Sequence, residues 1–374
     1  MILFSVVVVD LIGFGVVVPI LPFIAEHYGA SATVLGLLLT SFSAMQFVFS
    51  PIWGRLSDRI GRRPVLLFTI AGSVLSLVFL AYSTSIPFLF IARMCAGLFA
   101  ANISVASAYV TDVTSEEDRT KGMGLIGAAF GVGFLLGPAL GGFLSQNGFR
   151  LPLLVAAGLN FLNLIHTAIR LPEPARHHRR DDPIQTSALK HKGVFSVCGL
   201  NLLFTISINQ LEAVFALFMM ERFFFNSMKV AMLLSFMALL MIIIQGGLIR
   251  PLGRRYGEKI LFVVGTLFLA VAFVLIPYSP TALILLIPLT FAAVGRALGQ
   301  PTLMSLASKM GPPHGRGAVM GTFQASASLG RVFGPLIAGL LYDRKITAPF
   351  YFAAGLMLFV TFLSEKLKGA SASL

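Results

Sequence analysis

The sequence predicts an all-α membrane protein with twelve transmembrane helices in two pseudo-symmetric six-helix bundles. Its 374 residues are 57% hydrophobic and only 11% charged, whereas a soluble domain has about 25% charged residues. Twelve windows are apolar over about 20 residues, the length that crosses a bilayer. Short motifs of the first half also recur in the second half, at an offset of 196 or 197 residues.

The twelve predicted helices follow the apolar windows in order. They are Ile2–Ala25, Thr33–Trp53, Pro64–Tyr82, Pro87–Val110, Gly122–Leu144, Pro152–Ile169, Val194–Met220, Val230–Ile249, Lys259–Pro277, Ala282–Leu306, Ala318–Leu341 and Pro349–Leu363. An even number places both termini on one side, and the basic loops make that side cytoplasmic. The sequence begins in an apolar segment without a basic region, which indicates a retained first helix rather than a signal peptide.

The longest polar stretch divides the helices six and six. We therefore expect an N-terminal bundle over 1–170, a cytoplasmic linker over 171–192 and a C-terminal bundle over 193–374. His177 and His178 in this stretch could hold a metal, but no Cys or His stands at a matching spacing. A solvated linker is the favoured interpretation.

The two halves repeat one another. Met123-Gly124, Gly137-Pro138 and Arg119 recur as Met320-Gly321, Gly334-Pro335 and Arg316, and Gly61 recurs as Gly257. Many secondary transporters are built from such repeats, with the substrate site at the repeat interface near the bilayer midplane.

The loop Gly54–Pro64 lies between the second and third predicted helices and contains four arginines. An ordinary cytoplasmic loop would explain the arginines, but not the positions of Gly54, Asp58 and Gly61. These positions resemble the major facilitator superfamily signature G-x-L-(A/S)-D-R-x-G-R-(K/R).

We expect this loop to act as a cytoplasmic latch. Asp58 could reach the positive start of the eleventh helix near Gly317-Ala318. Arg254 replaces this acid in the second half, which predicts a one-sided latch; alternatively, Asp58 serves only topology or folding. The latch residues are Gly54, Asp58, Arg59, Gly61, Arg62, Asp112 and Arg119.

Two acids, Asp10 and Glu212, fall inside predicted spans, each in the first helix of its half. An acid in hydrocarbon usually faces the bundle interior or a water cavity. Partial loss of water favours its neutral form, so it can take up and release a proton. We expect both to couple protons to transport. Glu212 could instead recognise a cationic substrate, and either acid could simply pair with a buried arginine.

Three arginines, Arg93, Arg296 and Arg331, also lie inside predicted spans. Each could pair with a nearby acid or hold the negative end of a substrate. The run Arg93-Met94-Cys95-Ala96-Gly97 resembles the fourth-helix pattern R-x-x-Q-G of the superfamily, with Ala96 in the place of Gln.

The fifth predicted helix carries the glycine-rich motif Gly133-x-x-x-Gly137-Pro138-x-x-Gly141-Gly142. Plain helix packing would explain it, since glycines allow close approach and Pro138 bends the helix. The full pattern resembles the antiporter motif of drug–proton exchangers, and Gly330-x-x-x-Gly334-Pro335 is its partner.

The first helix points to the same group. Its pattern Ile12-Gly13, Pro19 and Pro22 resembles the twelve-helix drug–proton antiporters, and Asp10 falls at the first-helix Asp of the tetracycline-efflux branch. That branch's third-helix Asp is Ser76 here, and Ile260–Ile276 contains no acid. The resemblance therefore implies drug efflux without implying tetracycline as the substrate.

The predicted function is proton-coupled efflux of small amphipathic compounds by a monomer in the plasma (inner) membrane. Alternatives are a dedicated metabolite exporter or symporter, and a membrane sensor on the same fold. We expect no enzyme activity and no cofactor, because an ATP-binding Gly loop, zinc spacings and a nucleophile triad are absent. The net charge of +13 is concentrated in cytoplasmic loops, which indicates topology rather than nucleic-acid binding.

Overall fold

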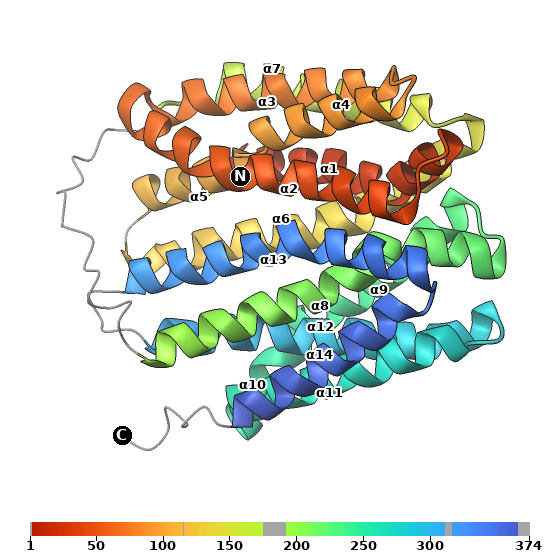
Figure 1. Ribbon diagram of the computed structural model, residues 1–374. Helices are drawn as coiled ribbons and strands as arrows, with labels where there is room; N and C mark the ends of the chain where they lie inside the picture. Colours follow the sequence, from red (N-terminus) through yellow and green to blue (C-terminus); the bar gives the residue numbers. More distant parts are fainter. Residues whose placement is uncertain (1, 115, 175–191, 311–315, 366–374) are drawn as a thin grey trace. The chain divides into compact units, whose positions relative to one another are not determined.

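A computed structural model describes the backbone of residues 2–114, 116–174, 192–310 and 316–365. Side chains are described in the same ranges except at 2, 116–124, 192, 310 and 316–318. Every regular element in these ranges is helical (Figure 1). Twelve helical spans in the described residues are long and apolar enough to cross a membrane, which confirms the predicted fold class.

The first six spans contain seven α-helices. They are α1 (Ile2–His27), α2 (Ala32–Ile60), α3 (Arg62–Ala81), α4 (Ile86–Phe99), α5 (Asn102–Val113), α6 (Glu116–Leu144) and α7 (Arg150–Arg170). The last six spans contain α8 (Lys192–Phe223), α9 (Ser227–Ile243), α10 (Ile249–Tyr256), α11 (Glu258–Leu275), α12 (Ala282–Met310), α13 (Arg316–Arg344) and α14 (Ala348–Glu365). A π-helical turn, Ile244–Leu248, joins α9 to α10 in the eighth span.

Glycines at equivalent positions separate two helix pairs. Gly61, between α2 and α3, has φ of +111°, and Gly257, between α10 and α11, has φ of +79°. Side chains disfavour positive φ, which glycine adopts freely. The chain can therefore end one helix and start the next within a single residue.

The fourth span is broken between α4 and α5. The break leaves backbone carbonyls without their helical partners, and α2 satisfies two of them. Gln46 Nε2 donates to the Ala100 oxygen at 3.0 Å, and Trp53 Nε1 donates to the Leu98 oxygen at 2.7 Å. The break places Asn102 at the start of α5.

The chain divides into two compact units. The first unit comprises Met1–His178 and Met219–Phe236, and the second comprises Arg179–Phe218 and Met237–Leu374. The end of α8 and the start of α9 thus group with the first unit. The division into two bundles joined by a linker over 171–192 stays a prediction. Most of that linker, with its His pair, lies outside the described residues.

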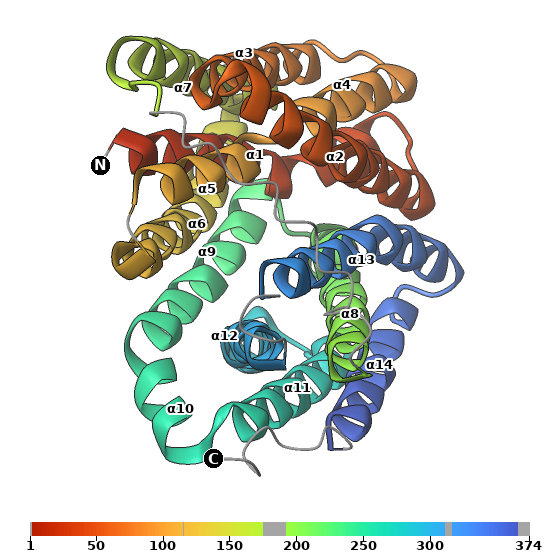
Figure 2. The same cartoon turned by 90° about the vertical axis from the view of Figure 1, so that its left-hand side faces the viewer.

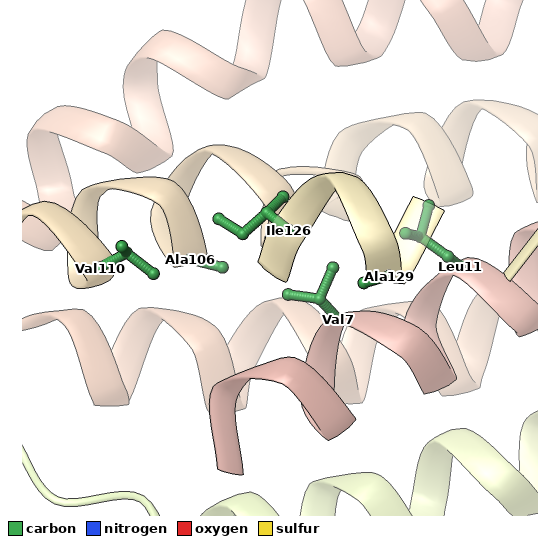
Figure 3. Packing of buried hydrophobic residues seen from close by; sticks show 6 residues of the cluster. All are labelled: Val7, Leu11, Ala106, Val110, Ile126 and Ala129. Atoms are coloured by element: carbon green, nitrogen blue, oxygen red, sulfur yellow. The ribbon is translucent and has the colours of Figure 1, made fainter. Parts of the chain in front are cut away.

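The core of the first unit forms where α1 meets α5 and α6 (Figure 2). Val7 and Leu11 of α1 pack with Ile126 and Ala129 of α6, beside Ala106 and Val110 of α5 (Figure 3). In the second unit, α11 packs along α12 and α14. These packed helices hold the charged side chains described next.

Candidate functional site

Asp10 lies on α1 in the first unit, next to the first residue of α5, Asn102. Its Oδ1 accepts a 2.7 Å hydrogen bond from Nδ2 of Asn102. Asn102 is 2% exposed, and its own Oδ1 has no hydrogen-bond partner in the described part of the chain. The site therefore contains a carboxylate and a buried acceptor oxygen that a proton donor could satisfy.

The second unit repeats the helix contact on which this site is built. A Cβ on Gly133 would meet Leu11, and one on Gly137 would lie 2.6 Å from the Gly15 Cα. In the second unit, Gly330 and Gly334 of α13 approach Thr205 and Asn209 of α8 in the same way. The α1 and α8 members of these contacts differ by 194 in number, and the glycines differ by 197.

This register assigns an apolar counterpart to the Asp10 site. An offset of 194 relates Asp10 to Phe204, and an offset of 197 relates Asn102 to Gly299. Phe204 is fully buried, and its ring lies against Gly299, where an added Cβ would be 2.8 Å away. The same position is thus filled by a polar pair in one unit and by an aromatic ring in the other.

Glu212 is not the counterpart of Asp10. It lies eight residues beyond Phe204 on α8, which is about 12 Å along a helix. Its carboxylate forms an ion pair with Arg296 of α12. Arg331 of α13 donates to the Ser328 hydroxyl at 2.8 Å and interacts electrostatically with Glu212. The structure therefore joins Glu212 and Arg296 in the second unit, with Arg331 on α13, which packs against α8.

Arg93 is buried in the first unit without a carboxylate partner among the described residues. Its guanidinium stacks over the Phe42 ring of α2, 4.3 Å from the ring centroid. Such contacts stabilise a cation by about 2 kcal/mol when water is excluded. Arg93 therefore bridges α4 and α2.

Arg62 is the centre of the basic loop in the first unit. Its Nε donates to Asp112 at 2.8 Å, and one Nη lies 2.6 Å from both Asp58 and the Ser57 hydroxyl. Asp58 is 54% exposed on its side chain. Within the first unit, the structure thus joins Asp58, Arg62 and Asp112.

Glu173 fixes the start of α3. Its two carboxylate oxygens accept from the backbone amides of Arg62 and Arg63 at 2.6 and 2.9 Å. These amides have no partner inside the helix, and negative charge is favoured at this end. A Cβ on Gly61 would lie 2.7 Å from the same carboxylate, so the absence of a side chain at Gly61 makes room for it.

The remaining latch residues, Gly54, Arg59 and Arg119, lie on α2 and α6. Gly54 has open space around it, and Arg59 lies in the last turn of α2. The side chains of Arg119 and of Gly317-Ala318, the expected target of Asp58, lie outside the described residues.

The second unit carries the same ion pair with its charges exchanged. Glu258 begins α11 and accepts from Lys309 of α12 at 2.8 Å. The established offsets of 196 and 197 relate Glu258 to Arg62 and Lys309 to Asp112. Arg254, the counterpart of Asp58, is exposed at the end of α10.

The glycine-rich motif lies along α1 and, at its end, along α9. Besides Gly133 and Gly137, a Cβ on Gly141 would lie 2.7 Å from the Val16 oxygen. Gly142 faces the start of α9, where an added Cβ would lie 3.1 Å from the Met228 Cα. Pro138 is inside α6. The motif thus allows two helices to approach the α6 backbone closely.

Comparison with known proteins identifies the family. The sequence model of the protein family described as "Major Facilitator Superfamily" matches residues 3–255 and 246–369. The chain belongs to the major facilitator superfamily.

Relatives within the major facilitator superfamily include drug exporters. The chain is 31% identical to tetracycline resistance protein, class C, of Escherichia coli, over 90% of this chain and 87% of the relative. It is also 31% identical to multidrug resistance protein 1 of Bacillus subtilis (strain 168), over 91% and 89% of the two chains. The resemblance to tetracycline-efflux proteins is thereby confirmed.

Solved major facilitator structures share the fold. The human organic anion transporter MFSD10 (TETRAN) superposes with a TM-score of 0.74 at 26% identity, covering 97% of this chain and 98% of the other. A bacterial homologue of the human lysosomal transporter Spinster, inward-facing and unoccupied, has a TM-score of 0.80 at 15% identity, covering 99% and 98%.

Four residues of this superfamily member escaped the sequence analysis: Asn102, Glu173, Glu258 and Lys309. The repeat offsets were sufficient to find Glu258 and Lys309, because they fall on Arg62 and Asp112. Asn102 and Glu173 gave no signal, since a single polar residue inside a span or within the linker fits packing and solvation equally well.

Proposed function

We propose that the protein exports small amphipathic compounds in exchange for protons, by alternating access. The family relationship supports transport, and the proteins similar to this chain include a tetracycline resistance protein, a multidrug resistance protein and an organic anion transporter. We place it in the inner membrane with both termini cytoplasmic, as the basic loops favour.

The Asp10 site is the observation that supports proton coupling. A carboxylate inside a membrane protein is costly, and Phe204 against Gly299 fills the equivalent position without any polar group. Packing of this helix pair therefore does not require an acid. The cost of Asp10 is better explained by a role in carrying a proton.

Proton binding at Asp10 would change the energies of the transport states. The charged carboxylate accepts from Asn102, whereas the neutral acid can also donate a proton in a hydrogen bond. Only interactions that differ between two states shift their populations. Proton uptake on one side and release on the other would therefore bias the exchange of conformations.

Glu212 remains a second candidate for protonation. Its ion pair with Arg296 means that movement of a proton there would also release an arginine. A dedicated metabolite exporter or a proton symporter would use the same parts, and a sensor on this fold would have no need of a proton carrier.

Proteoliposomes with an acidic lumen test the proposal. Purified protein is expected to accumulate aromatic drug-like compounds from a panel inside them, and a protonophore should stop the accumulation. Asp10→Asn should abolish gradient-driven accumulation while downhill exchange and folding persist. Glu26→Gln, at the exposed end of the same helix, is the matched control. Wild-type gradient dependence in Asp10→Asn would refute the assignment.

A further inference from the structure

The second unit contains an unequal cluster of charges on three membrane-spanning helices. It consists of Glu212 on α8, Arg296 on α12 and Arg331 on α13. Glu212 pairs directly with Arg296, while Arg331 reaches the Ser328 hydroxyl. Among the described residues, no carboxylate forms an ion pair with Arg331. The cluster thus contains one carboxylate and two guanidinium groups, which is an excess of one positive charge.

The cluster is accessible. The Glu212 and Arg296 side chains are 40% and 28% exposed, and Arg331 is partly exposed. Charged groups on spanning helices avoid lipid and face protein or water-filled space. An excess positive charge in such surroundings attracts a counter-charge, because Coulomb energies increase as the effective dielectric falls.

We propose that this cluster binds an anionic group of the transported compound, and that Arg331 makes the principal contact with a carboxylate. This inference rests on the proposed transport function and adds a substrate class to it. A guanidinium offers planar paired donors that match the two oxygens of a carboxylate. Ser328, which accepts from Arg331 at 2.8 Å, steadies the side chain on α13.

Glu212 has a different role in this site from recognition of a cation. Its charge is already balanced by Arg296, so it presents no excess negative charge to a cationic substrate. It instead limits the positive charge of the cluster. Removal of Glu212 alone should strengthen anion binding, and removal of Glu212 together with Arg296 should leave the Arg331 contact intact.

Binding of matched compounds to the purified full-length protein tests the proposal. The probes are benzoate, 2-naphthoate and 1-pyrenebutyrate, each beside its methyl ester, titrated by calorimetry at pH 7. The acid is expected to bind at least tenfold more tightly than its ester. Arg331→Gln should abolish this preference, and Arg331→Lys should retain part of it. Equal binding of acids and esters, or no binding of any acid, would overturn the proposal.

Further variants separate recognition from structure. Glu212→Gln should increase the preference for the acid, and the double variant Glu212→Gln with Arg296→Gln should keep it. Arg344→Gln, at the exposed end of α13, should behave as wild type. If Arg331→Gln weakens acids and esters alike, or lowers thermal stability beyond the control, Arg331 is a structural residue and the proposal fails.

The outcome is distinguishable from failure of the proposed function. Calorimetry measures binding without a proton gradient, so Arg331-dependent acid binding in a protein that exchanges no protons would refute only the coupling. Proton-driven accumulation of neutral compounds, without any preference for acids, would refute only the anion site.

Discussion

The side-chain amide of Asn102 donates to the Asp10 carboxylate at 2.7 Å, while the Asn102 oxygen has no hydrogen-bond partner among the described residues. Against a carboxylate an amide can only donate, but against a neutral carboxylic acid it can also accept. Rotation of the Asn102 amide would therefore satisfy its oxygen when Asp10 is protonated. Asn102 is thus suited to position Asp10 in both of its charge states.

Replacement of Asn102 by Leu is expected to slow proton-coupled exchange by about tenfold. A hydrogen bond to a charged group contributes about 1.5–3 kcal/mol, and its loss should destabilise the charged form of Asp10 more than the neutral form. Initial rates across pH 5.5–8.5 should therefore show a shifted profile, with a partial return toward wild type in Asn102→Gln. A Leu variant with an unchanged pH profile would show that Asn102 only fills space.

Asp58→Asn should favour the inward-open state and slow turnover, with substrate affinity largely kept. The 54% exposure of Asp58 means that its pair with Arg62 contributes only about 0–1 kcal/mol to folding. Spin-label distances between the cytoplasmic ends of α2 and α13 provide the measurement. Arg254→Asn, at the equivalent position of the second unit, should leave the distances unchanged. If the distances in Asp58→Asn equal those of the wild type, Asp58 acts only in topology or folding and the latch role is refuted.

The pair between Glu258 and Lys309 should be exchangeable. Glu258→Lys places two cations together and should lower the stability of the protein by about 1 kcal/mol, the upper range for partly exposed pairs. The double variant Glu258→Lys with Lys309→Glu should recover at least half of that loss in thermal unfolding. Additive effects of the two single changes would show that the contact contributes no coupling energy.

Gly137→Ala should disturb the packing of α6 on α1, because the new methyl group would lie 2.6 Å from the Gly15 backbone. A loss of about 1–3 kcal/mol, typical of overpacking, is expected in chemical unfolding. Gly127→Ala on the same helix has open space within 4 Å and should be neutral or slightly stabilising. Similar behaviour of the two variants would contradict the assignment of a close contact to Gly137.

The twelve spans were predictable because membrane length and apolar composition are properties of continuous segments. The break between α4 and α5 was not, since Phe99-Ala100-Ala101-Asn102 contains neither Gly nor Pro. That break depends on Gln46 and Trp53 of another helix, whose side-chain N–H groups donate to the free carbonyl oxygens of Ala100 and Leu98. The π-helical turn at Ile244–Leu248 does contain Gly246-Gly247, a local signal that the prediction of one regular helix over Val230–Ile249 did not use.

Of the candidate site, the sequence predicted the charged residues inside the spans but not the contacts between them. Asp10, Glu212 and Arg331 stand out in the sequence because charges are rare in spans. Their partners are set by helix packing, which brings Asn102 to Asp10 and Arg296 to Glu212 from 92 and 84 residues away. Because these partners are far apart in the sequence, the sequence alone does not show that Glu212 pairs with Arg296 and that Arg331 has no ion-pair partner among the described residues.

The reversed charges of the two ion pairs have a consequence for assembly of the chain. In a duplicated sequence, α3 could associate with the fourth span of the wrong half as the helices come together. Such an exchange would place Arg62 against Lys309 and Glu258 against Asp112, so that like charges meet in both places. Repulsive contacts of this kind act against a competing structure without improving the native one. The opposite order of charges in the two halves therefore favours pairing of helices within the same half, and it disfavours misfolded states in which helices of different halves pair.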